Sequence, residues 1–155
     1  MPSWSSSYGC TLSSGSLQRL SIEWCPKLIT SGREWGLHEL LSLEKLEICG
    51  DIEDGREPFP EERLLPTNLQ SLSFWNCPNM KRINHRGLAH LHSLTSLSFY
   101  CCPIMSFEGM PQDALPPSLS HLTFSGDCPL LKERCEKEKG PDWPLISHIP
   151  HVSMW

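Results

Sequence analysis

A short pattern of leucine and a second large apolar residue recurs along the chain. A Leu is followed by another Leu three residues later, and by Ile or Phe two residues after that. Five copies are present: Leu17, Leu20 and Ile22; Leu43, Leu46 and Ile48; Leu69, Leu72 and Phe74; Leu94, Leu97 and Phe99; Leu119, Leu122 and Phe124. Successive copies begin 26, 26, 25 and 25 residues apart. This spacing indicates a tandem repeat, so the chain is expected to fold as a stack of similar coils.

Each copy predicts one short strand, because residues two apart in a strand face the same side. Stacking the coils about 4.8 Å apart joins their apolar pairs into one core. In three copies a Cys-Pro pair follows, with the Cys eight residues after the first Leu and expected to turn inward, at Cys25, Cys77 and Cys102. Such an arrangement is typical of leucine-rich repeats. The predicted fold is an α/β leucine-rich-repeat solenoid, or horseshoe, of about five to six coils. Its short parallel strands lie on the concave face, with little regular helix.

A longer period spans two coils. The series Gly-Leu-x-x-Leu-x-x-Leu-x-x-Leu at residues 36–46 recurs 51 residues later at 87–97. The series Leu-Pro-x-x-Leu at residues 65–69 recurs 50 residues later at 115–119. Connections of the first kind are expected to form a helical turn, whereas proline holds those of the second kind extended.

The two ends of the chain differ from the central repeats. Residues 149–154 repeat the strand spacing with Ile149, Val152 and Met154, which predicts a sixth strand, and Leu130 to Lys139 could form a short charged helix. The expected organisation is a disordered or partial-repeat lead at 1–15, leucine-rich repeats at 16–128 and a C-terminal capping segment at 129–155. No polar cap precedes the first coil, so we expect the chain to be the C-terminal part of a longer protein.

Composition narrows the class of partner. Of the 155 residues 39% are hydrophobic and 20% charged, with a net charge of -5. This acidic balance argues against general binding to nucleic acid or to anionic membranes. The chain has no export signal and no apolar run of the roughly 18 residues that a membrane span needs. None of its asparagines begins an Asn-x-Ser/Thr site, which favours reduced cysteines in an intracellular protein.

The strand positions that alternate with the buried residues are candidates for partner binding, because they face the concave side. The candidates are Arg19, Glu23, Lys45, Glu47, Trp75, Tyr100 and His121. Most other positions on this face are small and polar, so Trp75 and Tyr100 stand out as adjacent aromatic anchors. The alternative is that both rings lie flat against neighbouring coils and only shield the sheet.

Motifs for metal binding and catalysis are incomplete. His38-Glu39 begins like a zinc-protease helix, but the residue four after His38 is Ser42, so the second ligand is missing. His90 and His92 are tied to no Ser or Cys nucleophile by a known motif. We therefore expect no catalytic residue, no metal and no cofactor, and we expect that the protein is not an enzyme.

The eight cysteines form no zinc motif, because no Cys-x-x-Cys is present. Cys101 and Cys102 are adjacent and cannot both face the same side of a strand. Cys77 and Cys102 are expected on stacked coils, at a separation that permits a disulfide. A reduced pair is the default expectation.

The repeats and the end of the chain together carry a specific resemblance. After the Leu-x-x-Leu-x-[Ile/Phe]-x-x-Cys-Pro copies and the Leu-Pro-x-x-Leu variant, residues 128–135 read Cys-Pro-Leu-Leu-Lys-Glu-Arg-Cys, and Asp-Trp-Pro and Ile-x-His-Ile-Pro follow at 142–144 and 146–150. From about residue 16 to 155 the chain resembles the C-terminal repeats of plant nucleotide-binding leucine-rich-repeat disease resistance proteins of the coiled-coil class. In that family the repeats receive a pathogen effector or modified host protein and hold the nucleotide-binding module inactive. The phosphate-loop motif is absent from this chain, so the resemblance does not extend to nucleotide switching.

The resemblance implies a protein-binding module of a plant immune receptor, in the cytoplasm or nucleus. Its partner would be a pathogen effector, a host target or a nucleotide-binding domain missing from this chain, and not nucleic acid or membrane. The alternative is the substrate-recognition part of an F-box type ubiquitin ligase subunit, whose repeats have similar lengths but lack the recurrent Cys-Pro pair. A secreted receptor would be expected to show a signal peptide and glycosylation sites.

Overall fold

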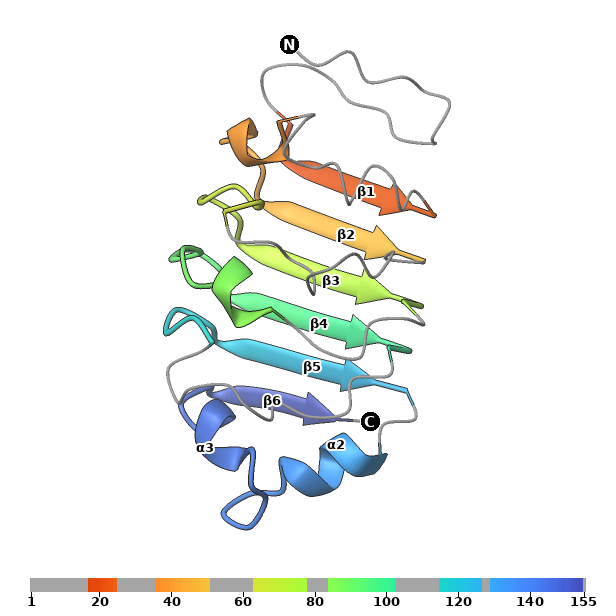
Figure 1. The fold of residues 1–155 in the computed structure, drawn as a ribbon, viewed down its shortest axis with the longest axis vertical. Coiled ribbons are helices and arrows are strands. Elements are labelled where there is room, and N and C mark those ends of the chain that lie inside the picture. The colour runs from red at the N-terminus through yellow and green to blue at the C-terminus, as the bar shows by residue number, and fades with distance from the viewer. Residues whose placement is uncertain are drawn as a thin grey trace.

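The computed structural model describes residues 17–24, 36–50, 63–77, 84–102, 115–126 and 129–154, with side chains from residue 131 in the last range. Within these residues six parallel strands form one sheet in the order β1-β2-β3-β4-β5-β6. The strands are β1 (Arg19–Glu23), β2 (Lys45–Cys49), β3 (Ser71–Trp75), β4 (Ser96–Tyr100), β5 (His121–Ser125) and β6 (His151–Met154). Figure 1 shows them stacked like the rungs of a ladder. The predicted α/β leucine-rich-repeat solenoid, including its sixth strand, is confirmed.

The register between strands builds the core. Each strand pairs with the next at equivalent repeat positions, which lines up two apolar rows across the sheet. The rows consist of Leu20, Leu46, Leu72, Leu97 and Leu122, and of Ile22, Ile48, Phe74, Phe99 and Phe124. All ten side chains are at most 3% exposed. Periodicity alone was therefore sufficient to predict these two buried rows.

The connections between strands follow the alternation seen in the sequence. The turns η2 (Leu37–Glu39) and η3 (His85–Gly87) are single 3₁₀ turns, in the two connections that were expected to be helical. Residues 63–70 and 115–120 contain turns but no helix. Asn84 caps η3, because its side-chain oxygen accepts a hydrogen bond from the amide of Arg86.

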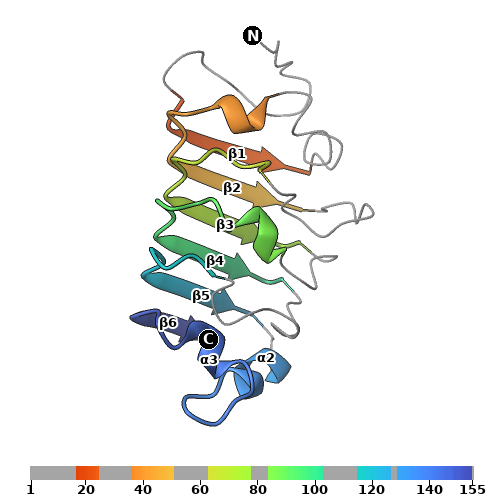
Figure 2. The ribbon, with the colours of Figure 1, turned by 60° about the vertical axis from the view of Figure 1, so that its left-hand side comes forward.

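Two short helices, α2 (Pro129–Arg134) and α3 (Trp143–Ile146), lie together at the β6 end of the stack (Figures 1 and 2). The helix expected from Leu130 to Lys139 is shorter than predicted and ends at Arg134. The carbonyl of Arg134 accepts a hydrogen bond from the amide of Asp142, so the chain folds back at this point. A Cβ atom at Gly140 would lie 2.1 Å from that carbonyl oxygen, which makes the close approach dependent on glycine.

A left-handed residue follows each of the first five strands. Trp24, Gly50, Asn76, Cys101 and Gly126 all have positive φ, between 51° and 116°. Four of their amides, those of Trp24, Gly50, Asn76 and Cys101, each donate to the last carbonyl of the next strand, at 2.7–2.9 Å. The turn therefore extends the ladder by one hydrogen bond and directs the chain toward the core. There the expected inward positions of Cys77 and Cys102 are confirmed, whereas Cys25 lies outside the described residues.

Replacing Cys101 with glycine should stabilise the protein, because a side chain with φ of 57° is strained and two of the equivalent positions already hold glycine. We expect a gain of about 0.5–1 kcal/mol in the free energy of unfolding, after the larger entropy loss of glycine is subtracted. Urea denaturation measures the change. Ser125→Gly, which alters a strand residue before the turn, is the control and should destabilise.

Candidate functional site

The outward side chains of the six strands form one surface, called here the outer sheet face. The register arranges them in three rows that run across the strands. The first row holds Arg19, Lys45, Ser71, Ser96, His121 and His151; the second holds Ser21, Glu47, Ser73, Ser98, Thr123 and Ser153; the third holds Glu23, Cys49, Trp75, Tyr100 and Ser125. All seven residues that the sequence nominated for binding lie on this face. They come from five strands and do not form one compact cluster.

The character of the outer sheet face changes along the stack. Strands β1 and β2 carry the charged positions, strands β3 and β4 carry serines and two aromatic rings, and strands β5 and β6 carry hydroxyl side chains and histidines. Both signs of charge occur in β1 and β2, with Arg19 and Lys45 in the first row and Glu23 in the third. A partner that spans the face from β1 to β6 would therefore contact charged groups first, then aromatic rings and then imidazoles.

An aromatic pair lies midway along the stack, in the third row of the outer sheet face, where β3 and β4 end. The rings of Trp75 and Tyr100 stack with centroids 3.9 Å apart and planes inclined by 18°. Trp75 is still 40% exposed, whereas Tyr100 is half-buried. Each ring is thus packed against the neighbouring coil, and the exposed part of the indole remains available for contact. The other outward residues of β3 and β4 are small serines, so the two rings are the largest side chains that these strands carry on the outer sheet face.

A second ring pair was not recognised as a pair from the sequence. His121 stacks on His151 with centroids 4.7 Å apart and planes inclined by 21°. His121 is among the residues nominated for binding, and the expected sixth strand places His151 on the same face after a step of 30 residues. The spacing of Ile149, Val152 and Met154 predicts that strand, but the stacking of the two rings depends on their side-chain rotamers.

Three of the five described cysteines, Cys49, Cys77 and Cys135, have thiols with a raised pKa, whereas the hydrogen bond with Cys77 lowers the pKa of the Cys102 thiol. Burial raises the pKa of the Cys49 thiol, and the carboxylate of Glu23 adds to the effect. The pKa of the Cys77 thiol is raised by its hydrogen bond with Cys102 and then by burial. Burial, with a contribution from the charge of Asp142, raises the pKa of Cys135 to about 12. A thiol with a raised pKa forms little of the reactive thiolate at neutral pH.

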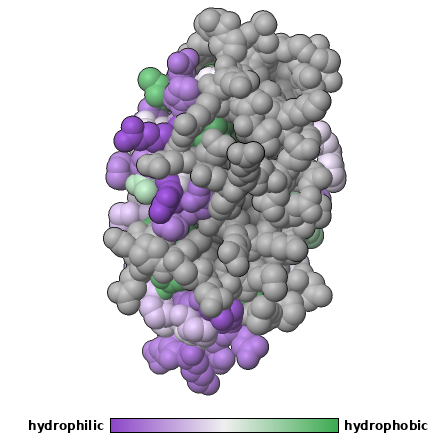
Figure 3. Space-filling model, in the orientation of Figure 1, coloured by the Kyte–Doolittle hydropathy of each residue, from purple (hydrophilic) through white to green (hydrophobic). Residues whose placement is uncertain are grey.

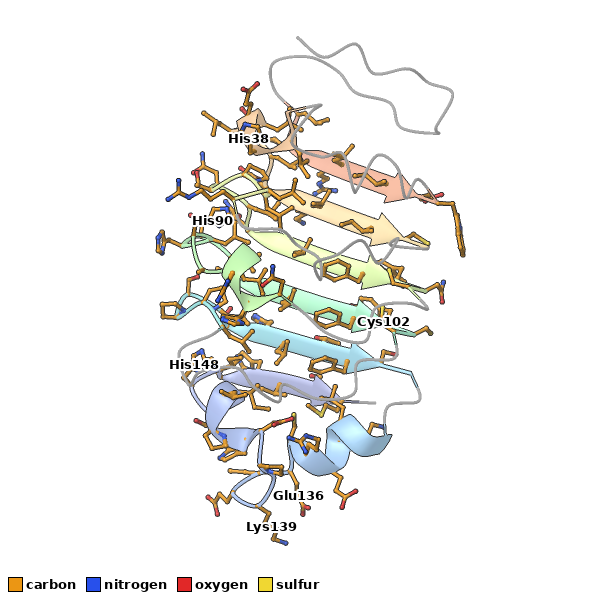
Figure 4. The ribbon with its side chains drawn as sticks, viewed as in Figure 1. His38, His90, Cys102, Glu136, Lys139 and His148 are labelled. Atoms are coloured by element: carbon orange, nitrogen blue, oxygen red, sulfur yellow. The ribbon has the colours of Figure 1, made fainter. Side chains whose placement is uncertain are left out.

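The remaining histidines do not converge on a site. His38, His90 and His148 lie on separate coils along the side of the stack where the strands begin, while Cys102 lies toward the opposite ends of the strands (Figure 4). Nε2 of His90 donates a hydrogen bond to the carbonyl of Leu65 at 2.7 Å. Across the described ranges no group of three or more His, Cys, Asp or Glu side chains is arranged to hold a metal ion.

A groove of about 510 Å³ lies at the C-terminal end, next to α2, α3 and β6. Its apolar lining includes Trp143, Ile149, Val152 and Met154, and its charged lining includes Lys132 and Glu136. Figure 3 shows that the surface at this end of the molecule is mainly hydrophilic. Val152 and Met154 continue the two core rows but are only half-buried, since they lie in the last strand of the sheet.

Comparison with known proteins identifies a plant relative of the chain. The chain is related to a disease resistance protein. The relative comes from Arabidopsis thaliana and is named "Putative disease resistance protein"; the two are 36% identical over 138 residues, which is 89% of this chain. The chain spans only 9% of the length of that protein. No protein-family model and no solved structure matches the chain.

None of the helices in the described part of the chain is both long and apolar enough to cross a membrane.

Proposed function

We propose that the chain is the protein-binding leucine-rich-repeat segment of a plant immune receptor of the nucleotide-binding, coiled-coil class. It would act without catalysis, in the cytoplasm or nucleus, by binding a pathogen effector or a host target and by docking on the nucleotide-binding module to keep it inactive. The relation to the Arabidopsis protein supports a role in disease resistance. The parallel-strand solenoid supports the assignment to leucine-rich repeats.

The outer sheet face is the single feature that carries the protein-binding part of the proposal. Its residues are held by backbone ladders and, from β1 to β5, by two fully buried core rows, so binding does not require them to be ordered first. It offers a partly exposed tryptophan stacked on a tyrosine, and the small side chains of Cys49 and Ser125 flank the two rings in the same row. Large rigid aromatics in such surroundings are the usual energetic centres of protein interfaces.

The charged end of the same face supports specific docking. Arg19 and Lys45 are register neighbours in the first row, and Glu47 lies in the second row of β2. Mixed charges at the edge of an interface steer orientation and on-rate more than they add affinity. A partner with an acidic patch facing Arg19 and Lys45, and with an apolar centre facing Trp75, fits this distribution.

Loss of the ring of Trp75 or of Tyr100 should strongly weaken binding of the partner. We expect Trp75→Ala or Tyr100→Ala to cost about 2 kcal/mol of binding free energy, which is roughly a 30-fold rise in Kd. Leu41→Ala is a matched control, because Leu41 is 60% exposed but lies outside the sheet. Surface plasmon resonance with the captured partner measures all three. Unchanged affinity in both aromatic variants would remove the pair from the interface.

Docking on a nucleotide-binding module can be tested directly in leaf tissue. The tagged chain is co-expressed with an autoactive nucleotide-binding module from a coiled-coil resistance protein, and co-precipitation and cell death are scored. Wild type should recover the module and suppress cell death, whereas Trp75→Ala should do neither and Leu41→Ala should do both. Recovery no better than with an unrelated leucine-rich-repeat protein, or recovery of a ubiquitin-ligase scaffold instead, would contradict the proposal.

A further inference from the structure

Two histidines are held side by side at the C-terminal end of the outer sheet face. His121 begins β5 and His151 begins β6, and the two are register partners in a parallel pair. Their ring centroids are 4.7 Å apart, and both residues are exposed. The backbone sets this proximity, because the amides of both His121 and His151 belong to the ladder that joins β4, β5 and β6. The two imidazoles are therefore neighbours in every conformation that keeps the sheet intact.

The hydrogen bonds of Ser120 determine which nitrogen of His121 carries the proton. Ser120 Oγ lies 3.1 Å from the carbonyl oxygen of Thr95 and 2.9 Å from Nδ1 of His121. A carbonyl can only accept, and the hydroxyl has one proton to donate. Both contacts are satisfied only when the hydroxyl donates to Thr95 and Nδ1–H of His121 donates to the hydroxyl oxygen. The neutral ring then has its lone pair on Nε2.

This arrangement is the one that metal-ligating histidines show. Such residues donate one ring N–H to a carboxylate, a backbone carbonyl or water, which fixes the tautomer and the orientation of the ring, and the serine hydroxyl is a comparable acceptor. Here Ser120, itself anchored to Thr95, occupies the place of that supporting oxygen. His121 therefore makes this supporting hydrogen bond without a bound ligand.

The two strands that carry the pair place no further positive charge on the outer sheet face. The other outward residues of β5 and β6 are Thr123, Ser125 and Ser153, and none of them is charged. The basic residues of the first row, Arg19 and Lys45, belong to β1 and β2 at the opposite end of the sheet.

We propose that His121 and His151 together bind a borderline divalent metal ion of the zinc type, with one ring nitrogen each and water in the remaining positions. Imidazole is a preferred ligand of such ions, at metal–nitrogen distances of roughly 2.0–2.1 Å. The lone pairs of stacked rings run nearly parallel, so the ring of His151 must turn about its Cβ–Cγ bond until its lone pair converges with that of Nε2 of His121, whose ring keeps its bond to Ser120. Both side chains are exposed, which leaves room for this rotation. The site does not depend on the proposed immune function.

Zinc titration followed by NMR of the histidine rings tests the proposal on the 155-residue chain. Ring signals distinguish imidazole binding from binding to the cysteines. Zn²⁺ should shift the signals of His121 and His151 together and saturably, and leave those of His92 and His148 in place. Before zinc is added, the nitrogen shifts of His121 should report a proton on Nδ1.

Three variants separate a two-histidine site from adventitious binding. His151→Ala should abolish the response of His121, whereas His148→Ala, which removes another exposed histidine, should leave it unchanged. Ser120→Ala should weaken binding about tenfold, as loss of a supporting hydrogen bond does at metal sites. Circular dichroism confirms that each variant keeps the sheet. Equal shifts at all histidines, or an unaltered His121 response in His151→Ala, would overturn the proposal.

Discussion

Replacing Phe99 with alanine should lower the free energy of unfolding by about 3–5 kcal/mol. Phe99 is 1% exposed, and its ring lies between those of Phe74 and Phe124 at centroid distances of 5.2 Å on each side. The planes are inclined by only 5° and 9°, so the three rings form one column through successive coils. Removing the middle ring leaves a cavity that two separate coils must border, and neither can collapse without leaving the ladder.

Urea denaturation followed by circular dichroism measures this loss. Ser96→Ala is the matched control, because Ser96 lies in the same strand on the outer sheet face and should change stability by no more than about 0.5 kcal/mol. A loss below about 1 kcal/mol for Phe99→Ala would show that the column is not packed as described.

Replacing Asp142 with alanine should destabilise the C-terminal unit by about 3–5 kcal/mol. The Asp142 carboxylate is 4% exposed and accepts two hydrogen bonds from Arg134, from Nε at 2.8 Å and from the terminal nitrogen at 2.9 Å. Both residues are also joined through the backbone, where the amide of Asp142 donates to the carbonyl of Arg134. Truncation of the acid leaves a guanidinium, 25% exposed, against the core without its partner carboxylate.

A double variant distinguishes an unsatisfied charge from a loss of packing. Arg134→Met combined with Asp142→Leu removes both charges and should be less destabilising than Asp142→Ala alone. The ion pair between Lys139 and Glu136 is the exposed control, at 3.5 Å on the terminal loop (Figure 4). Lys139→Ala should cost almost nothing, since exposed pairs contribute little. Hydrogen exchange of the α2 and α3 amides localises the effect. Equal losses of stability in Asp142→Ala and in the double variant would refute the argument.

The central repeats could be predicted from the sequence because their burial is periodic. In each strand the residues at alternate positions enter the core, so a pattern such as Leu72-x-Phe74 specifies both the strand and its inward face. The constant spacing then sets the register, since any slip would move an apolar residue to the outer sheet face. The residues of that face follow from the same alternation.

The contacts between coils could not be predicted in this way. Stacking of Trp75 on Tyr100 depends on the rotamers of two side chains in different repeats, on which sequence spacing has no bearing. The left-handed conformations of Trp24 and Cys101 also run against local preference, because neither residue type favours positive φ. The ladder hydrogen bonds that these amides donate impose the conformation.

The C-terminal unit shows where local reasoning failed. The sequence suggests a short charged helix from Leu130 to Lys139, but the helix ends at Arg134, whose side chain turns to the buried Asp142 eight residues away. A buried ion pair of this kind is formed by tertiary structure and leaves no periodic signal. The register of His121 with His151 does follow from the repeat spacing, whereas the stacking of their rings depends on side-chain rotamers.

The equivalence of coils has a consequence for how genes of this kind can change length. Gln70 and Thr95 hold the same place in successive coils, since the carbonyl of each accepts the amides that begin the next strand. Excising residues 71–95 would join Gln70 to Ser96 and set Leu97 where Leu72 had been, next to Leu46. Recombination between misaligned repeats can therefore shorten or extend the array by whole coils, and each product has an outer sheet face of new composition on the same backbone frame.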